Sequence, residues 1–191
     1  MIAFDYSMSS PALCFQTGDS SYEIHVINSR KKFEGTYHAN GFKIVVHYYD
    51  PKKNGHDDIT RFGTLAEIFL DNIPETDDKV AVFEAYAFGA KGMLATIGEC
   101  TGIMKHELVT RGYSILTLSP TTVKKYATGS GKADKSQMAE AFHSLYGFHV
   151  WELLGCKNDS ESPTSDCVDS YYVLKTGEVE RLITKVDRDL K

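Results

Sequence analysis

The sequence has no long apolar run and few cysteines, and each absence excludes a class of protein. No stretch approaches the roughly 20 apolar residues that cross a bilayer, and the chain reaches an acid at Asp5 where a signal peptide would be apolar. The four cysteines are scattered, with no C-x-x-C pair and no His at ligand spacing, at positions 14, 100, 156 and 167. We therefore expect a cytoplasmic protein that contacts no membrane and has neither a zinc site nor a disulfide framework.

Length and composition are those of an ordinary globular protein. A chain of 191 residues with 42% hydrophobic content can build a sizeable core, so we expect residues 1–191 to form a single domain. The formal net charge of −5 argues against a general nucleic-acid coat protein. It leaves open a local basic groove and acids whose charge is cancelled by bound metal.

One run of β-branched and aromatic residues contains a single carboxylate. Residues 80–86 (VAVFEAY) are typical of a strand buried on both faces, and Glu84 lies near its end. An unpaired ionised carboxylate in a core is costly, so Glu84 needs a raised pKa, a cation or solvent. A strand-end acid that points to water is the simpler interpretation. The pattern recurs, however, because residues 1–6 form a second strand of the buried type with Asp5 near its end.

The rest of the chain mixes strand and helix patterns, which predicts an α/β fold. Apolar alternation predicts strands over residues 12–16, 22–27, 43–49 and 114–118. Helical periodicity predicts helices over residues 57–73 and 93–111. Three further helices are predicted: one begins at Ser119, one ends at Tyr146 and one begins near Asp166. Apolar residues occupy two sides of the 93–111 helix. That suits a helix packed on its own sheet and on a second copy of the chain, and it suits equally well a fully internal helix.

A basic, glycine-containing loop follows the 114–118 strand. It combines two glycines with four lysines, Lys124, Lys125, Lys132 and Lys135. Glycines let a phosphate backbone approach closely, and ammonium groups neutralise it. The spacing is not that of a Walker loop, and a solvated surface loop is the simpler interpretation of these residues alone.

Two further acids, Asp166 and Asp169, are three residues apart near the start of the last helix. This spacing puts both carboxylates on one helix face, where they repel each other unless a cation lies between them. Acids that merely complement the helix dipole are an equally good interpretation of the pair alone.

Together, Asp5, Glu84, Asp166 and Asp169 make a candidate cluster of four carboxylates. Oxygen ligands without His or Cys favour Mg²⁺ or Mn²⁺. Two such ions roughly 4 Å apart are a common device for in-line displacement at phosphorus. Lysines on the neighbouring loop would hold the polyanion, so the charges favour a phosphodiesterase.

These motifs resemble those of the RuvC family of Holliday junction resolvases, within the ribonuclease H-like superfamily. The resemblance covers most of the chain and is carried by four segments, IAFDYSMSS, VFEAYAFGAKG, LSPTTVKKYATGSGKADKSQM and SDCVDSYYVL. It implies a mixed five-stranded sheet flanked by helices. It also implies a homodimer that uses Mg²⁺, with Mn²⁺ able to substitute and two ions per site, to nick four-way DNA junctions symmetrically. By matching position, Asp5, Glu84, Asp166 and Asp169 would bind metal, and Lys124 and Lys135 would be the functional lysines.

The chain also departs from the family pattern. Bacterial members carry a stacking aromatic three residues after the second acid, but position 87 is Ala, with Tyr86 and Phe88 on either side as its candidate replacements. The segment from Arg30 to Asp58 is longer than usual, which suggests a phage-type member. Two alternatives stay open: a nuclease for other branched DNA or RNA/DNA hybrids, and a catalytically silent protein that binds junctions.

Overall fold

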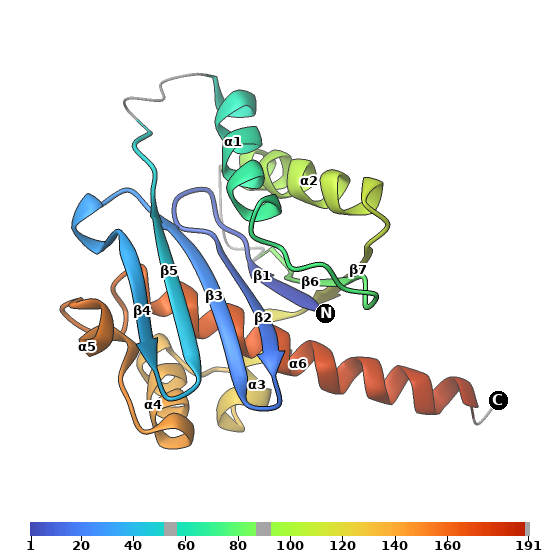
Figure 1. The fold of residues 1–191 in the computed structure, drawn as a ribbon. Helices are drawn as coiled ribbons and strands as arrows, with labels where there is room; N and C mark the ends of the chain where they lie inside the picture. Colours follow the sequence, from blue (N-terminus) through green and yellow to red (C-terminus); the bar gives the residue numbers. More distant parts are fainter. Residues whose placement is uncertain (52–56, 87–92, 190–191) are drawn as a thin grey trace.

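The chain folds around one mixed sheet of seven strands (Figure 1). The computed structural model describes residues 1–51, 57–86 and 93–189. The spatial order is β4-β5-β3-β2-β1-β6-β7. In chain order the strands are β1 (Ile2–Asp5), β2 (Ala12–Gly18), β3 (Ser21–Asn28), β4 (Gly35–Ala39), β5 (Phe42–Tyr48), β6 (Val80–Glu84) and β7 (Ser114–Leu118).

The central strands of the sheet are buried except at their ends. β1 pairs antiparallel with β2 and parallel with β6, and β6 pairs parallel with β7. Ile2 and Phe4 point into the core on one face and Ala3 into the core on the other, as the period of two in a strand requires. The rings of Phe4 and Phe83 stack with their centroids 4.8 Å apart, which ties the ends of β1 and β6 together.

Helices cover both faces (Figure 1). α1 (Asp58–Leu70) and α2 (Leu94–Thr110) lie on one face, where they enclose one core cluster. α6 (Thr164–Asp189) crosses the other face, and its second half projects beyond the sheet. The shorter helices on the α6 side are α3 (Pro120–Thr128), α4 (Lys135–Tyr146) and α5 (Val150–Leu154). A single 3-10 turn, η1, spans Lys31–Phe33.

The predicted α/β class is confirmed, but the sheet has seven strands and not the five we expected. The two strands beyond that count are β4 and β5 at the edge of the sheet. The apolar pattern predicted β5, as residues 43–49, and β5 runs parallel to β3. Sequence analysis missed β4 because this edge strand is half-exposed and lacks strong apolar alternation. It turns into β5 through Asn40 and Gly41, both at positive φ, which is the backbone of a tight hairpin.

Local signals set several helix ends, and the helix start predicted at Ser119 is confirmed. Ser119 caps α3 by accepting a hydrogen bond from the Thr122 N–H, with Pro120 at the first helical position. Asp134 and Gln137 form a reciprocal capping box at the start of α4. Within the described ranges, no helix combines the length and apolar content needed to span a membrane.

Candidate active site

Strand pairing brings Asp5 and Glu84 side by side. Phe4 of β1 is opposite Phe83 of β6, so the next residue on each parallel strand, Asp5 and Glu84, stands at the same edge of the sheet. Both are half-buried and both line a cavity of about 460 Å³. The two acids that the sequence placed near strand ends are therefore neighbours in space.

The first turns of α6 bring the other two acids to the same edge. α6 packs across β1 and β2, and Asp166 is buried whereas Asp169 is half-buried. Oδ2 of Asp166 accepts hydrogen bonds from the hydroxyls of Ser10, at 2.7 Å, and Ser162, at 2.5 Å. Asn28 in turn donates to the Ser162 hydroxyl at 3.1 Å. A small polar network therefore fixes the orientation of Asp166.

The pKa shifts show that the four acids act on one another. Burial raises the pKa of Asp5 well above its usual value, and repulsion from Asp169, Asp166 and Glu84 raises it further, against the attraction of Lys135. Burial also raises the pKa of Asp169, to about 7, against the attraction of Lys135. Burial raises the pKa of Glu84, and the attraction of Lys124 and Lys135 opposes this rise. Ionising all four carboxylates would therefore concentrate negative charge that these lysines only partly offset.

Two of the four predicted lysines lie close enough to the acids to affect their pKa values. Lys135, at the start of α4, donates from Nζ to the Ser165 hydroxyl at 2.9 Å, one residue before Asp166. Lys124, on α3, is half-buried and lowers the pKa of both Glu84 and Asp169. Lys125 and Lys132 are exposed around the turn between α3 and α4. The basic loop thus lies beside the acids and presents its outer lysines to solvent.

The chemistry of the donor set fits a hard divalent cation. All four candidate ligands are carboxylates, and oxygen-only sets suit Mg²⁺ and Mn²⁺. Their burial and mutual repulsion are relieved by added positive charge. As the side chains stand, however, no three His, Cys, Asp or Glu residues in the described part of the chain are close enough together to form a ready-made metal site. The acids are neighbours without yet forming a coordination shell.

Comparisons with known proteins by sequence and by structure both find RuvC proteins. No family model matches the sequence. Crossover junction endodeoxyribonuclease RuvC from two strains of Nitratidesulfovibrio vulgaris is 24% identical over 131 residues, which cover 68% of this chain and 74% of the relative. The structure of Thermus thermophilus RuvC matches with a TM-score of 0.55 at 15% identity, over 92% of this chain and 94% of that one. T. thermophilus RuvC in complex with a Holliday junction substrate matches with a TM-score of 0.52 at 16% identity, over 91% and 92%.

The chain resembles RuvC in both sequence and fold. The resemblance stated from the motifs is confirmed, and so is the ribonuclease H-like class of the fold. The extra β4–β5 pair lies outside the five central strands of this RuvC-like sheet, at the edge far from β6 and β7.

Of the two candidate stacking aromatics, Tyr86 and Phe88, only Tyr86 lies in the part of the chain that the structure describes. Phe88 and position 87 lie outside the described residues. Tyr86 is half-buried and lines the same cavity as Asp5 and Glu84. Nζ of Lys105, on α2, lies 5.4 Å from the centroid of its ring. Tyr86 is thus held near the acids, and its predicted contact with DNA stays a prediction.

Sequence analysis missed two kinds of residue at this RuvC-like site. Ser10 and Ser162 hold Asp166, yet isolated serines in turns carry no sequence signal for that role. Arg61 of α1 lines the cavity with Asp5 and Glu84. A lone arginine on an amphipathic helix is usually a solvated residue, so only the packing of α1 could reveal it.

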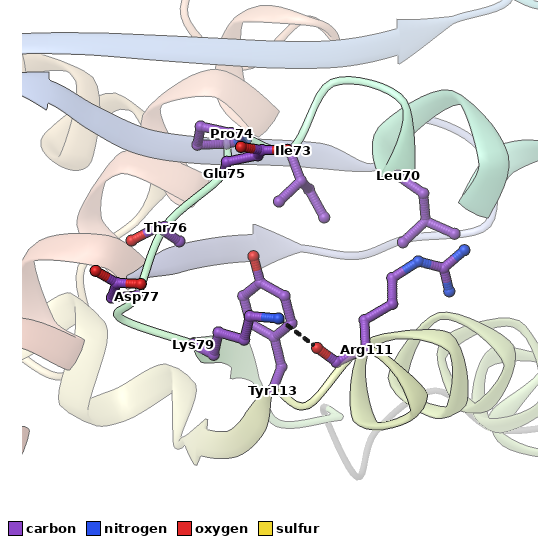
Figure 2. Close-up of a pocket in the computed structure, with 9 residues that line it drawn as sticks. All are labelled: Leu70, Ile73, Pro74, Glu75, Thr76, Asp77, Lys79, Arg111 and Tyr113. Carbon is purple, nitrogen blue, oxygen red and sulfur yellow. Dashed lines mark hydrogen bonds between the residues drawn. The ribbon is translucent and has the colours of Figure 1, made fainter.

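A second cavity lies away from the acids (Figure 2). It has a volume of about 660 Å³ and includes Lys79 and Tyr113, which immediately precede β6 and β7. The Lys79 ammonium group donates to the Arg111 carbonyl at 2.8 Å. Because Glu84 lies at the other end of β6, and because none of the predicted site residues lines this cavity, it is not the candidate active site.

Proposed function

We propose that residues 1–191 act as a single metal-dependent DNA endonuclease domain that resolves four-way junctions by symmetric nicking in the cytoplasm. The observation that carries the proposal is the meeting of Asp5, Glu84, Asp166 and Asp169 from three elements, beside Lys124 and Lys135. Similarity to crossover junction endodeoxyribonucleases, one solved with a Holliday junction, supports DNA junctions as the substrate.

The four carboxylates are the proposed ligands of two Mg²⁺ ions, with Mn²⁺ able to substitute. When bound, such a pair supplies an activated water and stabilises the leaving oxygen at phosphorus. Asp5 is the proposed central ligand because its carboxyl group interacts with all three other acids. Ser10 and Ser162 engage Oδ2 of Asp166 and orient its carboxylate towards the cluster.

The lysines have a separate proposed role. Lys135 and Lys124 lower the negative charge at the acids, and the same charges would attract the phosphodiester as it approaches. Lys125 and Lys132, exposed beside them, would contact flanking phosphates together with Tyr86. Such contacts hold the DNA in register without reading its sequence.

We propose that the active form is a homodimer, because symmetric nicking needs two sites. On α2, one face is buried through Cys100, Met104 and Leu108, while Leu94 and Val109 are exposed. Exposed apolar residues on a helix that also packs on its own sheet suit an interface with a second copy. Light scattering during junction cleavage tests this: a monomer with full activity would contradict it.

The decisive experiment is cleavage of synthetic four-way junctions with each divalent metal, followed by strand-by-strand mapping of the nicks. We expect paired nicks at symmetric positions in Mg²⁺ and Mn²⁺, and fewer products from three-way, flap and RNA/DNA hybrid substrates. Junction binding without any nicking would show a catalytically silent protein. Equal cleavage of all these substrates would show a nuclease of broader range.

A further inference from the structure

The cavity at Asp5 and Glu84 extends away from the other two acids, towards α1 and α2. Beside the two acids it is lined by Tyr6 and Met8 after β1, Tyr86 after β6, Arg61 from α1, and Met93 and Ile97 near the start of α2. Its volume of about 460 Å³ lies within the range of ligand sites, about 300–1,000 Å³. It therefore has room for a ligand at the rim of the proposed catalytic centre.

Arg61 supplies a cation to this cavity. Its Nη2 pairs with Oδ1 of Asp58 at 3.0 Å, but Asp58 is an exposed residue one helical turn away. Exposed pairs of this kind contribute little, so the pair is readily exchanged for another anion. The Arg61 Nε is buried and has no hydrogen-bond partner among the described residues.

This charge is separate from the cations that serve the four acids. Burial raises the pKa values of Asp5, Glu84 and Asp169; Lys135 opposes this rise at all three acids, and Lys124 opposes it at Glu84 and Asp169. Burial raises the pKa values of Tyr49 and Cys100, on the α1 and α2 side of the sheet, and the Arg61 guanidinium opposes that rise. A cation that the acids do not use is available to a phosphate.

Tyr6 also lines this cavity. Its side chain is buried, at 8% exposure, and its hydroxyl has no hydrogen-bond partner in the ranges that the structure describes. Apolar Met8, Met93 and Ile97, with the ring of Tyr86, suit the flat face of a base.

We propose that this cavity is a nucleotide subsite, in which Arg61 binds the phosphate next to the one that is cleaved and the apolar walls receive the attached nucleoside. The inference rests on the proposed nuclease function, because it places the scissile phosphate at Asp5 and Glu84. Arg61 then acts as a substrate-binding residue on the opposite side of the acids from the lysines of α3 and α4. The two groups of cations hold the strand on both sides of the nick.

The test pairs protein variants with chemically altered junctions. Single-turnover cleavage is measured for the wild type, Arg61→Gln and Arg61→Lys, on junctions in which one phosphate at a time beside the mapped nick is a neutral methylphosphonate. In the wild type, one such replacement should slow cleavage about tenfold, the usual effect of losing a hydrogen bond to a charged group. The Arg61→Gln variant should cleave the unmodified junction about tenfold more slowly than the wild type does. The methylphosphonate that slows the wild type should not slow this variant further. Arg61→Lys should recover part of the rate.

The matched control is Arg111→Gln. Arg111 also pairs with an acid of its own helix, Glu107, but it lies at the far end of the sheet in the second cavity. The Arg111→Gln variant should cleave the junction at the wild-type rate. If Arg61→Gln cleaves at the wild-type rate, or stays as sensitive as the wild type to every methylphosphonate, the subsite is overturned while the nuclease function stands. If the wild type fails to cleave the unmodified junction, the proposed function itself is overturned, and the subsite with it.

Discussion

The Ser10 hydroxyl donates a hydrogen bond to Oδ2 of Asp166 over 2.7 Å, across 156 positions of sequence. The Ser162 hydroxyl donates to the same oxygen, and its own oxygen lies 2.6 Å from that of Ser10, so the turn after β1 and the segment before α6 meet at a candidate ligand. A carboxylate held in this way is oriented before any cation arrives.

Ser10→Ala should therefore lower the affinity for Mg²⁺ more than it lowers the stability of the fold. Loss of a hydrogen bond that orients a ligand usually lowers metal affinity about 10–100-fold, so the Mg²⁺ concentration for half-maximal cleavage should rise. A Mg²⁺ titration of junction cleavage measures this. Thr176→Val is the control, because it removes a buried hydroxyl of α6 that donates to the Tyr172 carbonyl. An unchanged Mg²⁺ requirement in Ser10→Ala would show that Asp166 needs no such support.

Asp5→Asn should abolish cleavage and yet stabilise the metal-free protein. Activity should fall at least about a thousandfold, because the proposed central ligand is lost. Stability should rise because the neutral amide removes the burial cost and the repulsion that raise the pKa of Asp5. Thermal melting in EDTA measures the second effect.

Asp78→Asn is the matched control for that melting experiment. Asp78 pairs with the N-terminal ammonium group and with Arg181, and its pKa is lowered. Neutralising it should leave Tm unchanged or lower it. The interpretation of Asp5 as a repelled, buried acid fails if Asp5→Asn also lowers Tm.

Gly177→Ala should push α6 away from the sheet. A Cβ at Gly177 would lie 2.8 Å from Cγ2 and 3.0 Å from Cγ1 of Val82, so α6 or β6 must shift. Such overpacking costs about 1–3 kcal/mol, and it should also slow cleavage because α6 carries Asp166 and Asp169. Gly63→Ala on α1 is the control, since a Cβ there meets nothing within 4 Å. It should stabilise the protein by about 0.5–1 kcal/mol. Urea unfolding measures both.

The His25–His47 pair should make folding sensitive to acid. Nδ1 of His25 lies 2.9 Å from Nε2 of His47, an arrangement that needs at least one neutral ring. Burial, and then the neighbouring His25, lower the pKa of His47 to about 4, and burial lowers that of His25. The unfolded chain therefore binds more protons than the folded one below pH 6.5, the ordinary value, and stability is lost as pH falls from there towards 4.

His47→Asn should reduce this acid sensitivity, measured as the change in Tm between neutral and mildly acidic buffer. His38→Asn is the control, because His38 is exposed on β4. An equal change in Tm for the wild type and His47→Asn would show that the pair does not govern stability in acid.

Local sequence patterns were enough to predict the elements that carry the site. The predicted strands that carry Asp5 and Glu84 are present, and Asp166 and Asp169 share the first turns of a helix. The segments predicted to begin at Ser119 and to end at Tyr146 are helices. These features depend on neighbours within a few residues, which the sequence displays directly. The strand count could not be predicted in the same way, because β4 is held mainly by its pairing with β5 and not by its own apolar pattern.

The sequence by itself determined which residues carry charge and which local structures hold them: four carboxylates at strand ends and a helix start, with four lysines in one basic segment. Tertiary structure alone decided which of these meet. Lys135 and Lys124 reach the acids while Lys125 and Lys132 face solvent, Ser10 and Ser162 support Asp166, and Arg61 enters the cavity at Asp5. The physical reason is that these relationships depend on the packing of α1 and α6 against opposite faces of one sheet. Distant segments are brought together only when the cores on both faces close, and no local pattern records that.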